Sequence, residues 1–178
     1  MKKNIRAGRY TTDNSEPIVV FIIGMRINKR WAVHQWLPVF KAMPGMIKEL
    51  YTHQEELGFL GTENYFGLRT TTMIQYWKST EDLLAYAKME KHLAAWKGFN
   101  QRARNNDAVG IYHETYQIQA GSYESIYVNM PSYGLSQAKA PILIGKGNGK
   151  ETAKERLSTT NSRADSLGIS FCNHHKMF

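Results

Sequence analysis

The stretch Ile18–Ile27, IVVFIIGMRI, decides the fold because it is the most apolar run of the 178-residue chain. Apolar residues follow one another along it instead of alternating with polar ones, which is typical of a central strand covered on both faces. A run of this length, ending near Arg26, is far short of the roughly 20 apolar residues that cross a bilayer. We therefore predict a central β-strand here and no membrane span.

The segment after this strand has helical periodicity. Between residues 36 and 54 the large apolar side chains recur at three- and four-residue steps: Leu37, Phe40, Met43, Ile47, Leu50 and Tyr51. This spacing predicts an amphipathic helix. Pro38 suits its first turn, whereas Pro44, which is followed by Gly45, is expected to break or kink it.

Two strands and a second helix follow. Glycines punctuate this part of the chain, so we predict strands over residues 58–65 and 68–77 with a tight connection between them. The second helix is expected to begin at Ser79 or Thr80, where a hydroxyl can cap it, and to end near residue 104. Its apolar stripe consists of Leu83, Tyr86, Met89, Leu93, Trp96 and Phe99.

The last regular segments are again strands. Polar residues bound the stretch Val109–Ile118, VGIYHETYQI, and a shorter strand is predicted over residues 123–129. The order of elements is then β, α, β, β, α, β with an extra C-terminal strand. This order predicts an α+β, ferredoxin-like domain over residues 18–135. Both helices cover one face of an antiparallel sheet in this fold, so the other face needs a partner chain or a ligand.

The two ends of the chain differ from this domain. Residues 1–17 are predicted to form a basic extended lead, and residues 136–178 a polar, loosely ordered tail or a short appended helix. Much of the net charge of +8 lies in these ends, and no nucleic-acid-binding motif lies between them, so we expect no nucleic-acid partner. The single cysteine, Cys172, permits no internal disulfide, and no apolar signal-peptide core follows the basic start. Both features point to a cytoplasmic protein.

Several stretches resemble one family in order along the chain: GRYTT (8–12), VVFIIGMRINKRW (19–31), HQWLPVFKAMPGMIKEL (34–50), TTTMIQYWKSTEDLLAYA (70–87), HLAAWKGFN (92–100), GIYHETYQI (110–118) and YESIYVNMP (123–131). They resemble the bacterial and fungal family that includes the monooxygenase-like protein of the fumagillin pathway. This resemblance implies a dimeric α+β barrel, similar to antibiotic-biosynthesis monooxygenases, in which the sheets of a homodimer face each other. The resemblance also implies a choice of functions. In the wider superfamily some members oxidise aromatic or terpenoid molecules without a cofactor, others bind haem, and others only regulate or carry ligands.

His113 is the candidate catalytic residue. Strand alternation places it with Val109 and Ile111 on one face and places Glu114 with Tyr112 on the other, so His113 and Glu114 cannot form a contacting pair. We predict that the face with His113 points away from the helices into the barrel interior, where an imidazole can transfer protons near neutral pH. The alternative is a strand histidine that only hydrogen-bonds a neighbour.

The candidate substrate-binding residues come from a helix and from strands. His92, Trp96 and Asn100 are four residues apart on the second predicted helix and so form one row. This row presents an imidazole, an indole and an amide to a ligand; alternatively, Trp96 belongs to the core and His92 to its rim. The further candidates lie in the predicted strands: Arg69, Tyr76 and Tyr112. Mixed polar and bulky residues there suit a cavity wall or, equally, a dimer interface.

Three functions remain open at this point. The first is a small monooxygenase that oxidises a hydrophobic, aromatic or terpenoid-like molecule without a bound cofactor, with His113 as the base. The second is a haem-binding protein or haem-dependent enzyme, with His92, His113 or His34 as the axial ligand. The third is a non-enzymatic ligand-binding or interaction module of the same fold. No metal site is expected, because two adjacent histidines, His174 and His175, do not make one.

Overall fold

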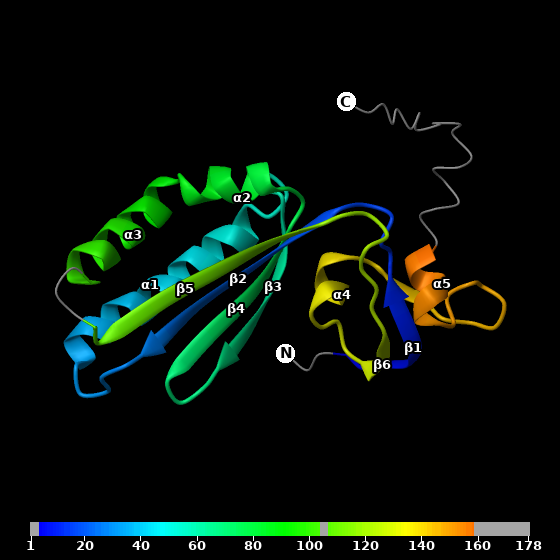
Figure 1. Cartoon of the computed structure of the whole chain (residues 1–178), viewed down its shortest axis with the longest axis horizontal. Coiled ribbons are helices and arrows are strands. Elements are labelled where there is room, and N and C mark those ends of the chain that lie inside the picture. Colours follow the sequence, from blue (N-terminus) through cyan, green and yellow to red (C-terminus); the bar gives the residue numbers. More distant parts are fainter. Residues whose placement is uncertain (1–3, 104–106, 159–178) are drawn as a thin grey trace, which may run out of the picture.

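An antiparallel main sheet forms the centre of the molecule. The computed structural model describes residues 4–103 and 107–158. The strands of the main sheet are β2 (Ile18–Ile27), β3 (Phe59–Phe66), β4 (Thr70–Trp77) and β5 (Val109–Ile118). Their order across the sheet is β3-β4-β2-β5 (Figure 1). With helices between β2 and β3 and between β4 and β5, this order is ferredoxin-like, so the predicted α+β fold is confirmed.

β2 is the central strand that its apolar sequence predicted. It pairs with β4 on one side and with β5 on the other, so that Ile22 lies between Ile74 and Glu114. The bounds of β2 and β5 are those predicted. β4 begins later than predicted, because Leu68 and Arg69 belong to the turn between β3 and β4.

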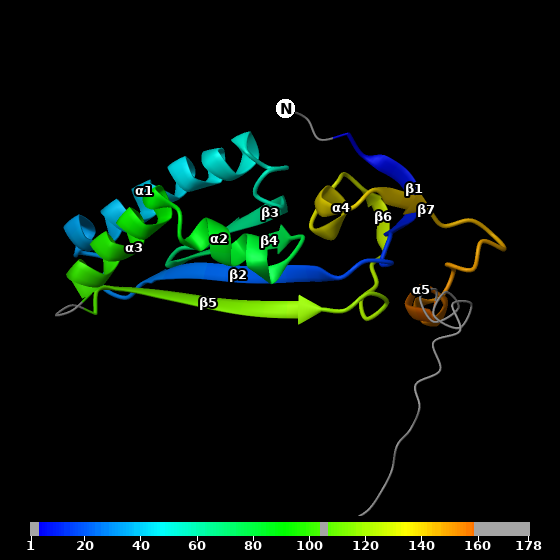
Figure 2. The same cartoon turned by 90° about the horizontal axis from the view of Figure 1, so that it is seen from above.

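The helices α1 (Val33–Thr52), α2 (Thr80–Ala87) and α3 (Glu90–Ala103) cover one face of the main sheet. Figure 2 shows them on one side of β2 and β5. α1 runs as one helix with Pro38 and Pro44 inside it, so Pro44 does not end the helix. Pro44 is exposed to solvent within this continuous helix.

The second predicted helix is divided into α2 and α3. At the turn between them the N–H of Lys88 donates to the carbonyl of Ala85 (3.1 Å). Bonds of this i to i−3 type tighten a helix end, so α3 can take its own direction over the sheet. The start of α2 agrees with the prediction, since Ser79 is the N-cap and its Oγ accepts the N–H of Asp82 (3.1 Å).

The main core lies between the sheet and the helices α1 and α2. Trp77 is fully buried, and its ring centroid lies 5.3 Å from that of Phe59 and 5.6 Å from that of Tyr86. The Nε1 of Trp77 donates to Gln75 Oε1 (3.1 Å), so the polar atom of the indole is satisfied. Leu50 contributes from α1. A second core cluster joins β2 and β5 to α1 and α3 at the other end of the sheet.

A second, smaller antiparallel sheet joins the two ends of the chain. Its strands are, in order, β6 (Tyr127–Met130), β1 (Arg6–Thr12) and β7 (Pro141–Leu143). The predicted extra C-terminal strand is β6, and it belongs to this sheet rather than to the main one. The predicted lead contains β1. The tail was predicted as loosely ordered or as a short appended helix, and its first part is ordered as α4 (Leu135–Ala138), β7 and α5 (Ala153–Ser158).

A buried arginine holds the described part of the tail in place. Arg156 in α5 is buried, and its Nε donates to Glu124 Oε2 (2.7 Å). The Nδ2 of Asn14 donates to the carbonyl of Arg156 (2.8 Å). These contacts join segments far apart in sequence, so the local composition that predicted a loose tail did not reveal them. The rest of the predicted tail, residues 159–178 with Cys172, lies outside the described residues.

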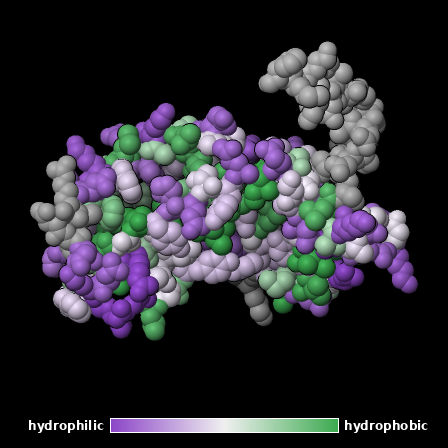
Figure 3. Space-filling model, in the orientation of Figure 1, coloured by the Kyte–Doolittle hydropathy of each residue, from purple (hydrophilic) through white to green (hydrophobic). Residues whose placement is uncertain are grey.

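The outer surface is mixed in polarity. In Figure 3, hydrophobic residues (green) occur in small groups between polar ones (purple) on the face in view. Within residues 4–103 and 107–158, no helix combines the length and the apolar composition needed to cross a membrane.

Candidate functional site

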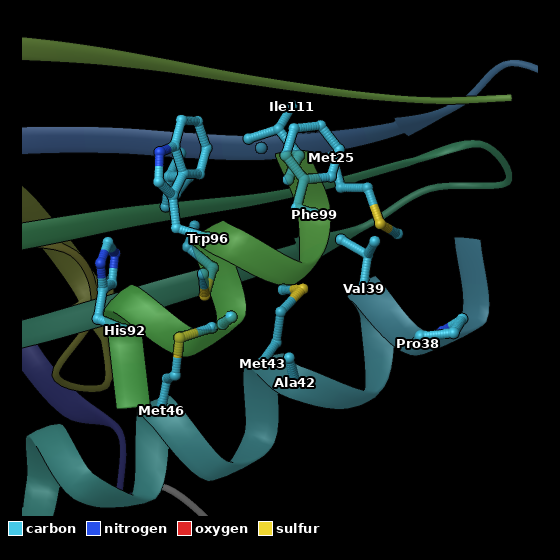
Figure 4. A pocket seen from close by; sticks show the side chains of 14 residues that line it. Met25, Pro38, Val39, Ala42, Met43, Met46, His92, Trp96, Phe99 and Ile111 are labelled. Carbon is cyan, nitrogen blue, oxygen red and sulfur yellow. The ribbon is translucent and has the colours of Figure 1, made fainter. Parts of the chain in front are cut away.

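An apolar pocket lies between the helices and the helix-facing side of the main sheet (Figure 4). Its volume is about 100 Å³. An apolar cavity of roughly 150 Å³ admits a benzene ring, so this pocket suits a branched alkyl group or part of a ring system. The residues that line it are Ile23, Gly24, Met25, Pro38, Val39, Ala42, Met43, Met46, Met73, His92, Ala95, Trp96, Phe99 and Ile111.

α1 builds one wall of the pocket with residues at helical spacing. Pro38, Ala42 and Met46 are four residues apart and share one face, with Val39 and Met43 beside them (Figure 4). The small side chain of Ala42 leaves space, and the flexible thioethers adapt to different shapes. Sequence reasoning treated Met43 as an ordinary core residue and missed this wall. The methionines on the inner face of α1 were the signal for it.

Among the described residues that line the pocket, His92 is the one with an ionisable side chain. It lies in the first turn of α3, and its Nδ1 is 3.0 Å from the carbonyl oxygen of Ala87. Because a carbonyl oxygen only accepts hydrogen bonds, Nδ1 carries the proton of the neutral ring. The lone pair is then on Nε2, which is the atom free to act as a base.

A tyrosine lies beside His92, and a carboxylate lies near that tyrosine. The ring of Tyr86 packs edge-on against the imidazole, with 5.5 Å between the ring centroids. Burial and, to a smaller extent, the charge of Glu49 raise the pKa of Tyr86 to about 12, so the phenol stays protonated at neutral pH. Glu49 Oε1 is 2.9 Å from Lys91 Nζ, whereas its buried Oε2 has no hydrogen-bond partner in the described part of the chain.

Trp96 stands beside His92 on α3 and belongs both to the pocket and to the surface. It lines the pocket, yet 43% of the residue is exposed. Its ring lies 5.7 Å from that of Phe99, measured between centroids. Figure 4 shows the two side chains of His92 and Trp96 projecting from neighbouring turns of α3, as their spacing predicted. Trp96 therefore lies at the border between the pocket and the surface.

The face of β5 that carries His113 lies on the opposite side from the predicted one. Val109 and Ile111 pack against α1 and α3, so this face lies under the helices and not away from them. His113 shares this face but is exposed and does not line the pocket; its ring is 5.6 Å from that of Phe21. The predicted orientation of His113 is wrong. The prediction of which β5 residues share a face is correct. Both faces of β5 mix polar and apolar side chains, so the sequence did not indicate which of them the helices cover.

Tyr76 and Tyr112 lie on the open face of the main sheet, which α1, α2 and α3 leave uncovered. The sheet therefore separates both residues from the pocket of His92. The hydroxyls of Tyr112 and Thr72 are 3.0 Å apart. The Tyr112 ring lies so close over Gly24 that a Cβ at this position would clash with it. The sequence interpretation combined His92, Tyr76 and Tyr112 in one substrate-binding site. Within one chain these three residues do not form a single site.

The remaining predicted residues lie outside the pocket. Arg69 is exposed in the turn between β3 and β4, and its carbonyl accepts the N–H of Ile27 (2.7 Å). Asn100 is exposed on α3, and His34 is exposed in the first turn of α1. None of the three side chains belongs to the pocket lining.

The span of the chain that builds this pocket has known relatives. Residues 18–135 match the family described as monooxygenase af470-like, and they include every residue that lines the pocket. The chain belongs to the monooxygenase af470-like family. The resemblance that the sequence stretches suggested is thereby confirmed. The matched span contains all strands of the main sheet and, in addition, β6 of the smaller sheet.

One relative in the af470-like family is monooxygenase af470 from Aspergillus fumigatus. It is 30% identical to this chain over 178 residues, an alignment that covers 91% of this chain and 60% of that protein. The chain thus spans less than two thirds of the length of this relative.

Solved structures share the fold of this af470-like chain. The aldoxime dehydratase OxdRE, solved in complex with butyraldoxime, superposes with a TM-score of 0.65 and 14% identity, covering 81% of this chain and 46% of that one. A second aldoxime dehydratase superposes with a TM-score of 0.64 and 18% identity, covering 79% of this chain and 43% of that one. At these identities the likeness concerns the fold alone.

Proposed function

We propose that the chain is a monooxygenase that oxidises an apolar organic molecule in the pocket between α1, α3 and the main sheet, with His92 as the general base. The observation that carries this proposal is a single imidazole in an otherwise apolar pocket of a chain from a monooxygenase family. Pockets of this kind bind hydrophobic molecules and orient them with few polar groups. The lining suits the aromatic or terpenoid-like class of substrate expected from the sequence.

In the proposed reaction, Nε2 of His92 removes a proton from a carbon that a neighbouring carbonyl or aromatic ring activates. The carbanion then reacts with O₂, and overall one CH₂ group and O₂ give C=O and water. The substrate supplies all four electrons, so this reaction needs no bound cofactor. The bond from Nδ1 to the carbonyl of Ala87 orients the imidazole and favours the tautomer with a basic Nε2.

We propose no role for haem in this reaction. Of the three histidines considered as axial ligands, His34 and His113 are exposed and lie outside the pocket, and His92 alone lines it within the described residues. The proposed reaction uses His92 as the base, so no step of it involves haem.

Filling the pocket is expected to inhibit the reaction. In Ala42→Phe, a ring from α1 occupies the space that a substrate needs. We expect oxidation of 2-tetralone, a ketone with an activated CH₂ group, to fall roughly tenfold because the substrate is displaced from His92. Oxygen uptake and product formation measure this loss.

The matched control for this experiment is Ala85→Phe, which adds the same ring at an exposed position of α2. It should leave oxidation unchanged. Full activity of a correctly folded Ala42→Phe variant would contradict the assignment of this pocket. Saturable binding of 2-tetralone without oxidation by the unaltered protein would instead support a non-enzymatic ligand-binding protein.

We also propose that the chain forms a homodimer through the open face of the main sheet. Tyr112 and Tyr116 on this face are 42% and 48% exposed, and tyrosine is enriched at protein interfaces. Sedimentation equilibrium should show a species of twice the mass of the chain. A monomer at every concentration would exclude the dimer.

A further inference from the structure

A second cavity lies on the opposite side of the main sheet from the pocket of His92. Its volume is about 360 Å³, within the range of roughly 300 to 1,000 Å³ that is usual for small-molecule sites. Ile18, Val20 and Ile118 form an apolar floor, and residues 123–135 supply walls. The sheet separates this cavity from the first pocket, so a molecule in one does not reach the other.

Tyr76 presents an available hydroxyl to this cavity. Its side chain is half-buried and lines the cavity, and it makes no hydrogen bond to the described residues. Gly134 faces it, because a Cβ at this position would lie 3.5 Å from Tyr76 Oη and 3.8 Å from Tyr127 Oη. The missing side chain at Gly134 leaves space in front of both hydroxyls. A phenol that the protein itself does not use can donate to a ligand.

Two further phenols lie at the cavity wall. The hydroxyls of Tyr133 and Tyr65 are 2.9 Å apart and form a hydrogen bond with each other. Tyr127 Oη accepts the N–H of Ser136 (3.2 Å), which holds α4 against the wall. The cavity therefore combines rings for contact with hydroxyls for orientation.

The hydroxyls of this cavity are neutral donors. The hydrogen bond with Tyr133 raises the pKa of Tyr65 to about 12, and burial raises the pKa of Tyr76 to about 12. Both phenols therefore keep their protons at neutral pH. The one charged residue of the described wall, Glu124, has its Oε2 bound by Arg156 Nε at 2.7 Å. No cationic side chain among the lining residues would hold an anion.

We propose that this cavity binds a neutral aromatic molecule through a carbonyl or hydroxyl oxygen that accepts a hydrogen bond from Tyr76. The apolar floor and the phenol rings provide contact area for a flat ring, and the free hydroxyl fixes its orientation. This site is independent of the oxidation proposed for the first pocket, because different residues on a different face of the sheet form it.

The test compares two probes of similar shape, 2-naphthol and 2-methylnaphthalene, by fluorescence anisotropy. Tyr76→Phe keeps the ring and removes the hydroxyl. We expect it to weaken the binding of 2-naphthol about 3- to 10-fold, the effect of one lost hydrogen bond, and to leave 2-methylnaphthalene unchanged. The matched control is Tyr51→Phe, an exposed tyrosine of α1 outside both cavities, which should change neither affinity.

The same titrations in the Ala42→Phe background assign the binding to one cavity. Binding of 2-naphthol that persists with the first pocket filled and weakens on Tyr76→Phe supports the proposal. It is overturned if 2-naphthol does not bind saturably, if Ala42→Phe removes the binding, or if Tyr76→Phe leaves the affinity unchanged. Binding of 2-naphthoate as tight as that of 2-naphthol would overturn the preference for a neutral ligand. Circular dichroism verifies that each variant is folded.

Discussion

Replacing His92 with alanine is expected to slow the oxidation of 2-tetralone about 100- to 10,000-fold, the usual contribution of a general base. The reason is that, among the described residues that line the pocket, His92 is the one with a basic side-chain atom, Nε2. Steady-state oxygen uptake gives the rate, and the uncatalysed oxidation of 2-tetralone sets the background. Added imidazole should restore part of the activity, because a small base can occupy the space left by the side chain.

Variants of two other histidines separate catalysis from folding. His53→Ala alters a half-exposed histidine at the end of α1, where Nδ1 contacts Glu56 Oε2 (3.2 Å), and should keep full activity. His113→Ala tests the residue that the sequence interpretation chose. If His113→Ala loses activity while His92→Ala keeps it, the proposed role of His92 is wrong and the base is the strand histidine. Loss in His92→Ala without any rescue by imidazole would indicate a purely structural role.

Replacing Trp77 with alanine is expected to lower the free energy of unfolding by about 3 to 5 kcal/mol, the usual cost of removing a large buried ring. Trp77 is fully buried and packs against Phe59 from β3 and Tyr86 from α2, so the cavity left behind lies where sheet and helix meet. Domains of ordinary stability have roughly 5 to 15 kcal/mol in total. The variant should therefore be marginally folded. Urea unfolding followed by far-UV circular dichroism measures the change.

Trp31→Ala provides the matched control for this measurement. Trp31 is 80% exposed, so the same substitution there should change the free energy of unfolding by roughly 0.5 kcal/mol or less. A loss below about 1 kcal/mol in Trp77→Ala would contradict the placement of this ring at the centre of the core.

Elements with a strong local pattern were predicted closely. β2 and β5 have the predicted bounds, because a continuous apolar run and clear turn residues mark them. β1 and β7 were missed. β7 has only three residues, and Tyr10 of β1 pairs with Tyr127 and Leu143, more than 100 residues further along the chain. Pairing over such a distance leaves no periodic signal in either segment, so composition predicted an extended lead and a loose tail.

The sequence by itself determined the order of the main-sheet strands and the family. It also determined which side chains share a face: His92 with Trp96 on α3, and His113 with Ile111 on β5. Only the tertiary structure decided which face of β5 the helices cover, and hence that His92 and not His113 lines the pocket. The periods of helix and strand are local properties of the backbone, whereas the side of a sheet that becomes buried depends on where distant helices pack. β5 has polar and apolar residues on both faces, so its own sequence carried no sign of that choice.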